Sequence, residues 1–201
     1  IHHRVKNNLQ TIASLLRLQA RRSNSMEVKE ALKESVNRIL SISVVHEFLS
    51  QQGDENIDVM EVTKNILQLI QQNMLDSHFK LETEFIGETI ILPSKQASNL
   101  ALIINELILN SIEHGFLGRN YGKIGLKISQ SDEAYIIELY DNGNGLPEKF
   151  FDLPTKSLGL QIVRTLIEGD MNGSFDLYND NGVHAKIAIP YKFLMESEVD
   201  V

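Results

Sequence analysis

Two amphipathic helical patterns open the chain, separated by a short polar break. Apolar side chains recur three and four positions apart in residues 1–22, and the same spacing returns in residues 26–51. Residues 23–25 (Ser-Asn-Ser) interrupt the pattern, and Ser25 is a candidate N-cap for the second helix. Two long helices joined by so short a turn fold back as an antiparallel hairpin. Because one hairpin leaves its apolar stripe uncovered, we expect residues 1–53 to dimerise into a four-helix bundle or to pack on the domain that follows.

The pattern changes around residues 53–56, and we expect a second domain over residues 57–193. Helix-like and strand-like segments are mixed there without a strict strand–helix–strand order. Helices are expected at 58–75, 95–114 and 158–169, and strands at 79–86, 89–92, 122–130, 134–141 and 183–190. The fold class predicted for the whole chain is therefore α+β.

Charge and composition bear on which partners the protein can bind and on whether it crosses a membrane. The net charge of −8 combines a basic segment 1–53, with eight Lys/Arg against four Asp/Glu, and an acidic remainder. The acidic part would repel a phosphate backbone, so direct nucleic-acid binding is not expected. The basic hairpin suits an acidic protein partner, or it is an ordinary solvated surface. The chain has no cysteine and no apolar run of the ~20 residues that a membrane span needs, and it begins at Ile1 inside a helical pattern. We expect a fragment of a longer protein, without a membrane segment.

Residues 2–10 read H-H-R-V-K-N-N-L-Q and place histidine on the first helix. His3 and Asn7 are four residues apart and share a helical face, beside the apolar seam of Val5 and Leu9. A neutral imidazole has a free lone pair and can accept a phosphoryl group, while an amide can position water. Taken alone, the segment is more typical of surface histidines on a basic helix.

The helix expected at 95–114 carries three polar side chains on one face of an otherwise apolar sequence. Glu106, Asn110 and His114 are spaced four residues apart. Such a stripe is costly in a core helix unless its side chains line a cavity or find partners. An amide oxygen such as that of Asn110 can bind Mg²⁺, which prefers oxygen ligands and usually retains water and nucleotide phosphates. The sequence favours a binding site here over a stripe bonded to backbone.

Two glycine-containing motifs follow this helix. Asp141 ends a strand and precedes Gly143 and Gly145, which form a simple turn or let the backbone approach a flat ligand. The run K-S-L-G-L enters the helix at 158–169, where it exposes N–H groups to phosphate or begins the helix with Ser157 as cap. The residues of this run are Lys156, Ser157, Leu158, Gly159 and Leu160. Each motif alone is a weak signal.

In this order and spacing, the motifs resemble the N, G1 and G2 boxes of the GHKL ATP-binding fold, an α/β sandwich with a mixed sheet. The resemblance implies ATP and Mg²⁺ as cofactors, with Asn110 binding Mg²⁺ and Asp141 reading the adenine amino group. It also implies a lid over residues 146–157 and a closing strand over 182–190. Val183 stands where many members have a threonine that helps to hold adenine through water. The residues implied for the nucleotide cleft are Asn110, His114, Asp141, Gly143, Gly145, Leu146, Lys156, Ser157, Leu158, Gly159 and Leu160.

The start of the chain, together with R-I-L-S-I-S-V-V-H-E-F-L at residues 38–49, resembles the HisKA_2 hairpin of histidine kinases, related to the HWE kinases. The two resemblances cover residues 1–190. They imply a cytoplasmic bacterial homodimer that phosphorylates His3 from ATP, with Asn7 linked to phosphatase activity. They imply transfer of the phosphoryl group to a response-regulator receiver. The resemblance also implies that the regulator carries an RNA-binding ANTAR output.

Two features leave the chemistry open. Common histidine kinases place an acid directly after the acceptor, but here Arg4 follows His3, so the group that takes the histidine proton is unassigned. Glu106 also resembles the base of anti-sigma serine kinases and MutL-type ATPases, which would turn over ATP without His3. A degenerate GHKL domain acting as a dimeric scaffold is a third alternative. The N-terminal hairpin favours the histidine kinase, because anti-sigma kinases lack it.

Overall fold

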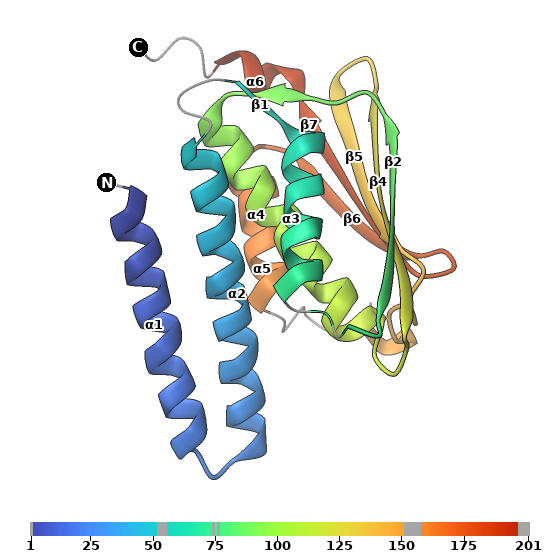
Figure 1. Ribbon diagram of the computed structural model, residues 1–201. Helices are drawn as coiled ribbons and strands as arrows, with labels where there is room; N and C mark the ends of the chain where they lie inside the picture. Colours follow the sequence, from blue (N-terminus) through green and yellow to red (C-terminus); the bar gives the residue numbers. More distant parts are fainter. Residues whose placement is uncertain (1, 52–55, 74, 76, 151–157, 197–201) are drawn as a thin grey trace.

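The N-terminal part of the computed structural model is a pair of long helices (Figure 1). The structure describes residues 2–51, 56–73, 75, 77–150 and 158–196. Helices α1 (His2–Arg22) and α2 (Met26–Gln51) form the expected antiparallel hairpin. Ser25 caps α2, since its Oγ accepts a hydrogen bond from the backbone N–H of Val28 at 3.3 Å. The predicted hairpin and its cap are confirmed.

The remaining described residues form an α/β domain around a five-stranded sheet. The strand order is β2-β4-β5-β7-β6. The sheet is mixed, as expected, because β2 runs parallel to β4 while the other neighbours are antiparallel. The strands are β2 (Lys80–Gly87), β4 (Tyr121–Gln130), β5 (Ala134–Asp141), β6 (Ser174–Asn179) and β7 (Val183–Pro190), with a separate ribbon of β1 (Ile57–Asp58) and β3 (Ile91–Leu92).

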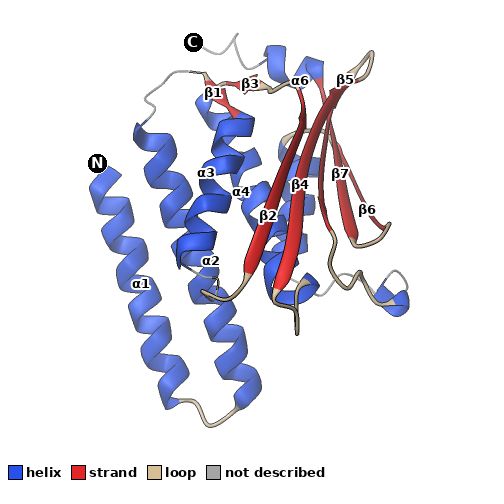
Figure 2. Cartoon of the chain, turned by 45° about the vertical axis from the view of Figure 1, so that its right-hand side comes forward, coloured by secondary structure: helices blue, strands red, loops and turns tan. Residues whose placement is uncertain are grey.

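Helices cover one face of this sheet and leave the other open (Figure 2). The covering helices are α3 (Val59–Asn73), α4 (Ser94–Asn110) and α5 (Leu158–Arg164). Helix α4 is at the centre of the core, where Leu100, Ile103 and Ile108 are fully buried. A 3₁₀ turn spans Glu148–Phe150, and α6 (Tyr191–Glu196) follows β7. Among the helices described, none combines the length and the apolar character needed to cross a membrane.

The hairpin lies against the α/β domain through α2. Helix α2 packs on α3 and α4, and α1 lies on the outer side of α2 (Figure 1). The side chains of Ile12, Leu15 and Leu18 on α1 are about half exposed, at 45%, 56% and 50%. Within one chain, the hairpin therefore packs on its own downstream domain and still presents an apolar stripe on α1.

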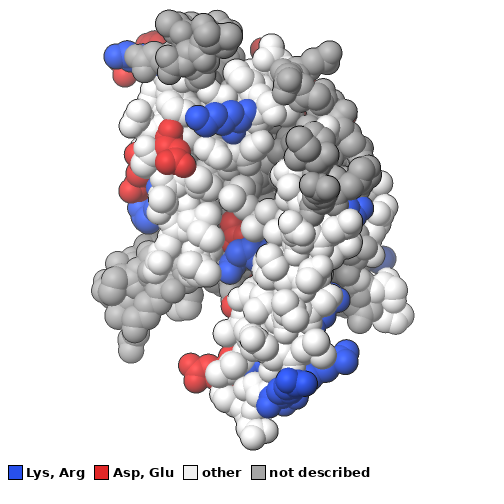
Figure 3. All heavy atoms as spheres, turned by 90° about the vertical axis from the view of Figure 1, so that its left-hand side faces the viewer, with Lys and Arg blue, Asp and Glu red and all other residues white. Residues whose placement is uncertain are grey.

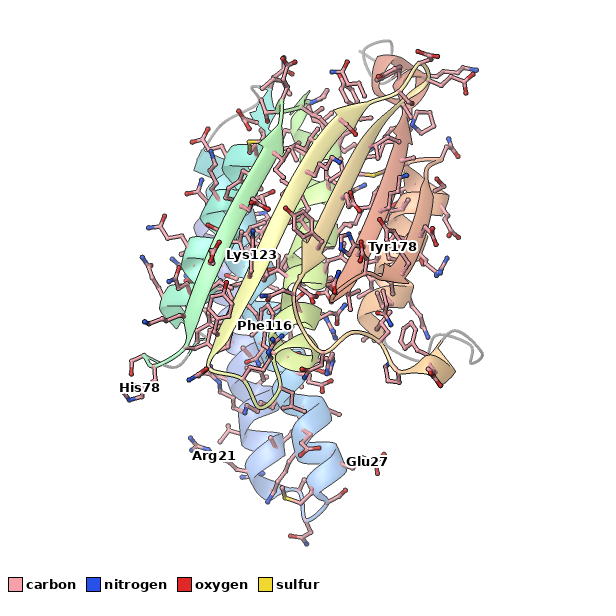
Figure 4. The ribbon with its side chains drawn as sticks, turned by 90° about the vertical axis from the view of Figure 1, so that its right-hand side faces the viewer. Arg21, Glu27, His78, Phe116, Lys123 and Tyr178 are labelled. Atoms are coloured by element: carbon pink, nitrogen blue, oxygen red, sulfur yellow. The ribbon has the colours of Figure 1, made fainter. Side chains whose placement is uncertain are left out.

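The open face of the sheet carries a row of aromatic and charged side chains. The rings of Tyr140, His184 and Tyr178 stack across three strands, with centroids 5.3 and 5.1 Å apart. Glu138 accepts a hydrogen bond from the Tyr178 hydroxyl at 2.5 Å, which raises the pKa of Tyr178 to about 12. Lys123 and Tyr178 mark this face in Figure 4. These paired polar groups explain how the face tolerates solvent.

The structure corrects the sequence-based elements at three places. Strands β1 and β6 and helix α6 were not predicted. Strand β6 is an edge strand with few apolar residues, so its alternation is a weak signal. The helices expected at 95–114 and 158–169 are present, but each ends in a π-helical turn, Ser111–Gly115 and Thr165–Asp170. A count of apolar spacing does not separate α from π turns.

Candidate nucleotide-binding site

A buried carboxylate at the end of β5 organises the site. Asp141 is 4% exposed and receives hydrogen bonds from three directions. Its Oδ1 accepts from the backbone N–H groups of Gly143 at 2.7 Å and Val183 at 3.2 Å, and its Oδ2 accepts from the Ser111 hydroxyl at 2.7 Å. Two carboxylate oxygens offer about four lone-pair positions, so one acceptor position remains for a ligand N–H.

Glycines at two positions allow the backbone to approach the Asp141 carboxylate closely. A Cβ on Gly143 would lie 2.6 Å from the carbonyl oxygen of Gly115. Gly182 has φ +144°, and a Cβ there would lie 1.9 Å from the carbonyl oxygen of Asp141. The backbone of three segments can therefore close around Asp141 only without side chains at these positions.

The contact at Gly182 gives a stability prediction. We expect Gly182→Ala to lower the free energy of unfolding by about 2 kcal/mol or more, because the methyl group meets backbone and the φ angle disfavours L side chains. Thermal or urea unfolding measures it. Gly169→Ala is the matched control, since nothing lies within 4 Å of its Cβ. Equal unfolding midpoints for the two variants would contradict the prediction.

Beside Asp141 lies a cavity of about 390 Å³, bounded by the C-terminal ends of α4 and β5 and the start of β7. Most of its wall is apolar, which suits a flat aromatic base, while Asp141 supplies an acceptor. Phe116 is buried below the end of α4 and packs on Phe79 with centroids 5.6 Å apart (Figure 4). The lining residues are Leu107, Asn110, Ser111, His114, Gly115, Leu139, Asp141, Gly145, Leu146, Pro147, Phe150, Leu160, Leu177, Val183 and Ala185.

Two of the three polar residues predicted on α4 reach this cavity. Asn110 and His114 line it, and Nδ2 of Asn110 is buried without a hydrogen-bond partner among the described residues. The π turn that follows Asn110 places Ser111 against Asp141. Asn110 therefore has an amide donor available to a ligand, and the Mg²⁺ role expected for its oxygen stays a prediction.

Glu106 finds a partner in the hairpin instead. Its carboxylate is fully buried, and its Oε2 is 2.6 Å from Nε of Arg38 on α2. Burial raises the pKa of Glu106, while the Arg38 charge acts in the opposite direction. Glu106 is not among the residues that line the cavity. Its other oxygen, Oε1, is buried without a hydrogen-bond partner among the described residues.

The residues predicted around the lid divide into three groups. Gly145 and Leu146 line the cavity, and both backbone groups of Leu146 bond to the amide of Asn179, at 2.8 and 2.9 Å. In the L-G-L run, Leu160 lines the cavity and Leu158 is exposed. A Cβ on Gly159 would meet the side chains of Glu106 and Arg38. Lys156 and Ser157 lie outside the described residues.

The two predicted hairpin residues lie on α1. His3 belongs to its first turn. Asn7 is exposed, and its carbonyl oxygen accepts a hydrogen bond from the Thr11 hydroxyl at 2.9 Å. Asn7 is not among the residues that line the cavity. The N-terminal end of α1 also lies away from the C-terminal end of α4, where the cavity is found (Figure 1).

Sequence reasoning missed three residues that shape the site. Ser111 and Asn179 hold Asp141 and Leu146, and Arg38 holds Glu106. A small polar residue directly after Asn110 on a core helix was a usable signal for Ser111. The sequence carries no comparable signal for Asn179 or Arg38, because their contacts depend on how segments distant in the chain pack together.

Family comparisons agree with both halves of this architecture. Residues 1–74 match the HisKA_2 family, described as "Histidine kinase", and residues 95–193 match HATPase_c, described as "Histidine kinase-, DNA gyrase B-, and HSP90-like ATPase". The chain belongs to the histidine kinase family. The predicted resemblance is confirmed for the hairpin and for the ATP-binding domain.

Curated relatives of this histidine kinase include the sensor histidine kinase PdtaS of Mycobacterium tuberculosis, 39% identical over 193 residues. That alignment covers 94% of this chain and 38% of PdtaS. Blue-light-activated histidine kinase 2 of Erythrobacter litoralis is 27% identical, over 84% of this chain and 49% of that protein. The chain thus spans less than half the length of these relatives.

Solved structures share the fold. The histidine kinase domain of a blue-light-activated kinase from Erythrobacter litoralis aligns with a TM-score of 0.65 and 23% identity, over 97% of this chain and 93% of that one. The catalytic domain of histidine kinase ThkA aligns with a TM-score of 0.55 and 22% identity, over 67% of this chain and 93% of that one. At these identities, the likeness concerns the fold alone.

The HATPase_c domain of this histidine kinase implies ATP, and the cavity fits it. Asp141 offers an acceptor at an apolar wall, as an adenine amino group requires. Nδ2 of Asn110 is a buried donor without a partner in the described structure, so it is available to a phosphate or other acceptor of the nucleotide, while the oxygen of the same amide would be the Mg²⁺ ligand. One amide oxygen plus phosphates and water is a donor set that Mg²⁺ accepts.

Proposed function

We propose that this histidine kinase transfers the γ-phosphoryl group of ATP to His3 and then to an aspartate of a response-regulator receiver. The observation that supports it is one chain that joins the cavity around Asp141 to a hairpin whose first turn carries His3. An imidazole nitrogen of His3 forms a bond to the γ-phosphorus, the bond to the bridging oxygen breaks, and ADP leaves. The imidazole proton passes to a base or to water.

In this proposal the residues of the cavity work mainly by positioning. Asp141 accepts from the adenine amino group, and the apolar wall encloses the base. The oxygen of Asn110 holds Mg²⁺, which neutralises phosphate charge when it is bound with ATP. Residues 146–157 form the lid, and Asn7 positions water for dephosphorylation.

The hairpin supports the proposed partners. Its loop end gathers Lys and Arg side chains (Figure 3), among them the exposed Arg17, Arg21 and Lys33, and an acidic receiver would meet them favourably. The exposed apolar stripe of α1 supports a homodimer. We propose the bacterial cytoplasm as its location, since ATP is the donor, and a receiver with an ANTAR output as a specific partner.

The experiment is to incubate the chain with γ-labelled ATP and Mg²⁺ and to map the label. We expect label that is lost in acid, is kept in alkali, and lies in the peptide that contains His3. Purified receivers with and without an ANTAR domain are then added, and the partner is the one that removes the label. Acid-stable label on a serine would refute the proposal.

A further inference from the structure

The hairpin and the α/β domain are joined by two polar contacts that the proposed chemistry does not use. Arg38 of α2 pairs with Glu106 of α4, with 2.6 Å between Nε and Oε2. One residue earlier on α2, Nδ2 of Asn37 donates to Oε1 of Glu113 at 3.0 Å. Glu106 and Glu113 are seven residues apart, about two helical turns, so both acids face the same helix of the hairpin.

This ion pair is enclosed. The side chain of Arg38 is 14% exposed and that of Glu106 is 0% exposed. A Cβ on Gly159 would lie 2.7 Å from Oε2 of Glu106 and 3.0 Å from a terminal guanidinium nitrogen of Arg38. The first turn of α5 therefore packs on the pair, and only a glycine leaves it room. An enclosed pair is costly to break by loss of one partner, because the other charge is left buried.

The arrangement that these contacts hold is unsuited to transfer within the chain. The cavity lies at the C-terminal end of α4. That end of the helix is at the lower end of the α/β domain in Figures 1 and 2. The N-terminal end of α1, which carries His3, lies near the upper end in both views. Phosphoryl transfer requires contact between the reacting atoms, so the domain must leave this position to phosphorylate His3 of its own chain.

We propose that Arg38–Glu106 and Asn37–Glu113 form an interdomain latch that holds the ATP-binding domain against α2 and restrains autophosphorylation. The proposal rests on the proposed function, with His3 as acceptor. Opening the latch frees the domain to move along the hairpin and releases the contact on Gly159 at the start of α5. A signal that shifts α2 relative to α4 would therefore change the rate of phosphorylation.

The test measures the initial rate of His3 labelling at saturating Mg-ATP in the whole chain. Arg38→Gln keeps an N–H donor but removes the charge, and we expect it to raise the rate at least about fivefold. Asn37→Ala removes the second contact without leaving a buried charge, so it serves if Arg38→Gln fails to fold, and a smaller increase is expected. Glu34→Gln is the matched control, because it removes one exposed charge from the same helix and should leave the rate unchanged.

Cross-linking the two sides of the latch should have the opposite effect on the rate of His3 labelling. The chain has no cysteine, so Asn37→Cys with Glu113→Cys introduces a single pair for a short bismaleimide linker. We expect the linked protein to bind ATP in calorimetry but to lose His3 labelling, while each single variant treated with the linker keeps it. Full labelling of the linked protein, or an Asn37→Ala rate no higher than that of the unaltered chain, would overturn the latch.

Two further outcomes separate the hypotheses. If Arg38→Gln labels more slowly while ATP affinity falls, Arg38 is a positioning residue of the nucleotide site, and the latch is wrong. If the unaltered chain, Arg38→Gln and Asn37→Ala all bind ATP but place no label on His3, the proposed function fails, and the latch fails with it.

Discussion

His3→Ala is expected to reduce acid-labile labelling of the chain to background while leaving ATP binding intact. The acceptor nitrogen is removed, but the cavity around Asp141 is separate from the first turn of α1. The measurement is label incorporation from γ-labelled ATP, together with calorimetric ATP affinity. The same variant tests the alternative that Glu106 activates serine or water, because ATP turnover would then continue at the unaltered rate.

His2→Ala is the control for this substitution. It removes the neighbouring imidazole from the same helical turn but leaves His3, so we expect labelling within about twofold of the unaltered chain. Loss of label in His2→Ala with full label in His3→Ala would move the acceptor by one residue. Label in both variants would place the phosphoryl group elsewhere.

Asp141→Asn is expected to weaken ATP binding far more than it weakens the fold. The asparagine oxygen can still accept from Gly143 and Val183, and the Ser111 hydroxyl can turn to accept from the new amide. A bound adenine amino group would instead lose a charged acceptor. We expect a loss of about 2 kcal/mol, or roughly 30-fold in Kd, measured by calorimetry.

The unfolding midpoint of Asp141→Asn decides how the affinity loss is interpreted. A large fall in stability would mean that Asp141 acts mainly as a structural tie. Asp132→Asn is the matched control, since it makes the same exchange at an exposed loop position. Unchanged ATP affinity in Asp141→Asn would contradict the role assigned to this carboxylate.

Much of this architecture could be predicted from local sequence. The hairpin follows from two apolar periods and a three-residue break, and α4 with its polar stripe follows from spacing alone. Asp141, Gly143 and Gly145 were identifiable only from the order of the motifs along the chain, because a strand end followed by glycines is also ordinary turn chemistry. These features depend on residues near one another in the chain, where periodicity and turn chemistry are informative.

Other features required the tertiary structure. Glu106 and Asn110 have the same spacing as Asn110 and His114, yet Glu106 pairs with Arg38, 68 residues earlier, while Asn110 and His114 line the cavity. No rule of helical spacing predicts which helix packs beside a given face. The role of Val183 could not be predicted from its side chain either, because it is the backbone N–H of Val183 that donates to Asp141.

The three hydrogen bonds to Asp141 have a consequence for local motion. They join the turn after α4, the loop after β5 and the start of β7 to one side chain, so these segments should open together and not independently. In hydrogen–deuterium exchange, the amide protons of Gly143 and Val183 should therefore exchange at closely matched rates. A bound nucleotide should slow exchange at both amides by a common factor. The two amides together would then report how strongly the ligand stabilises the closed form of these segments.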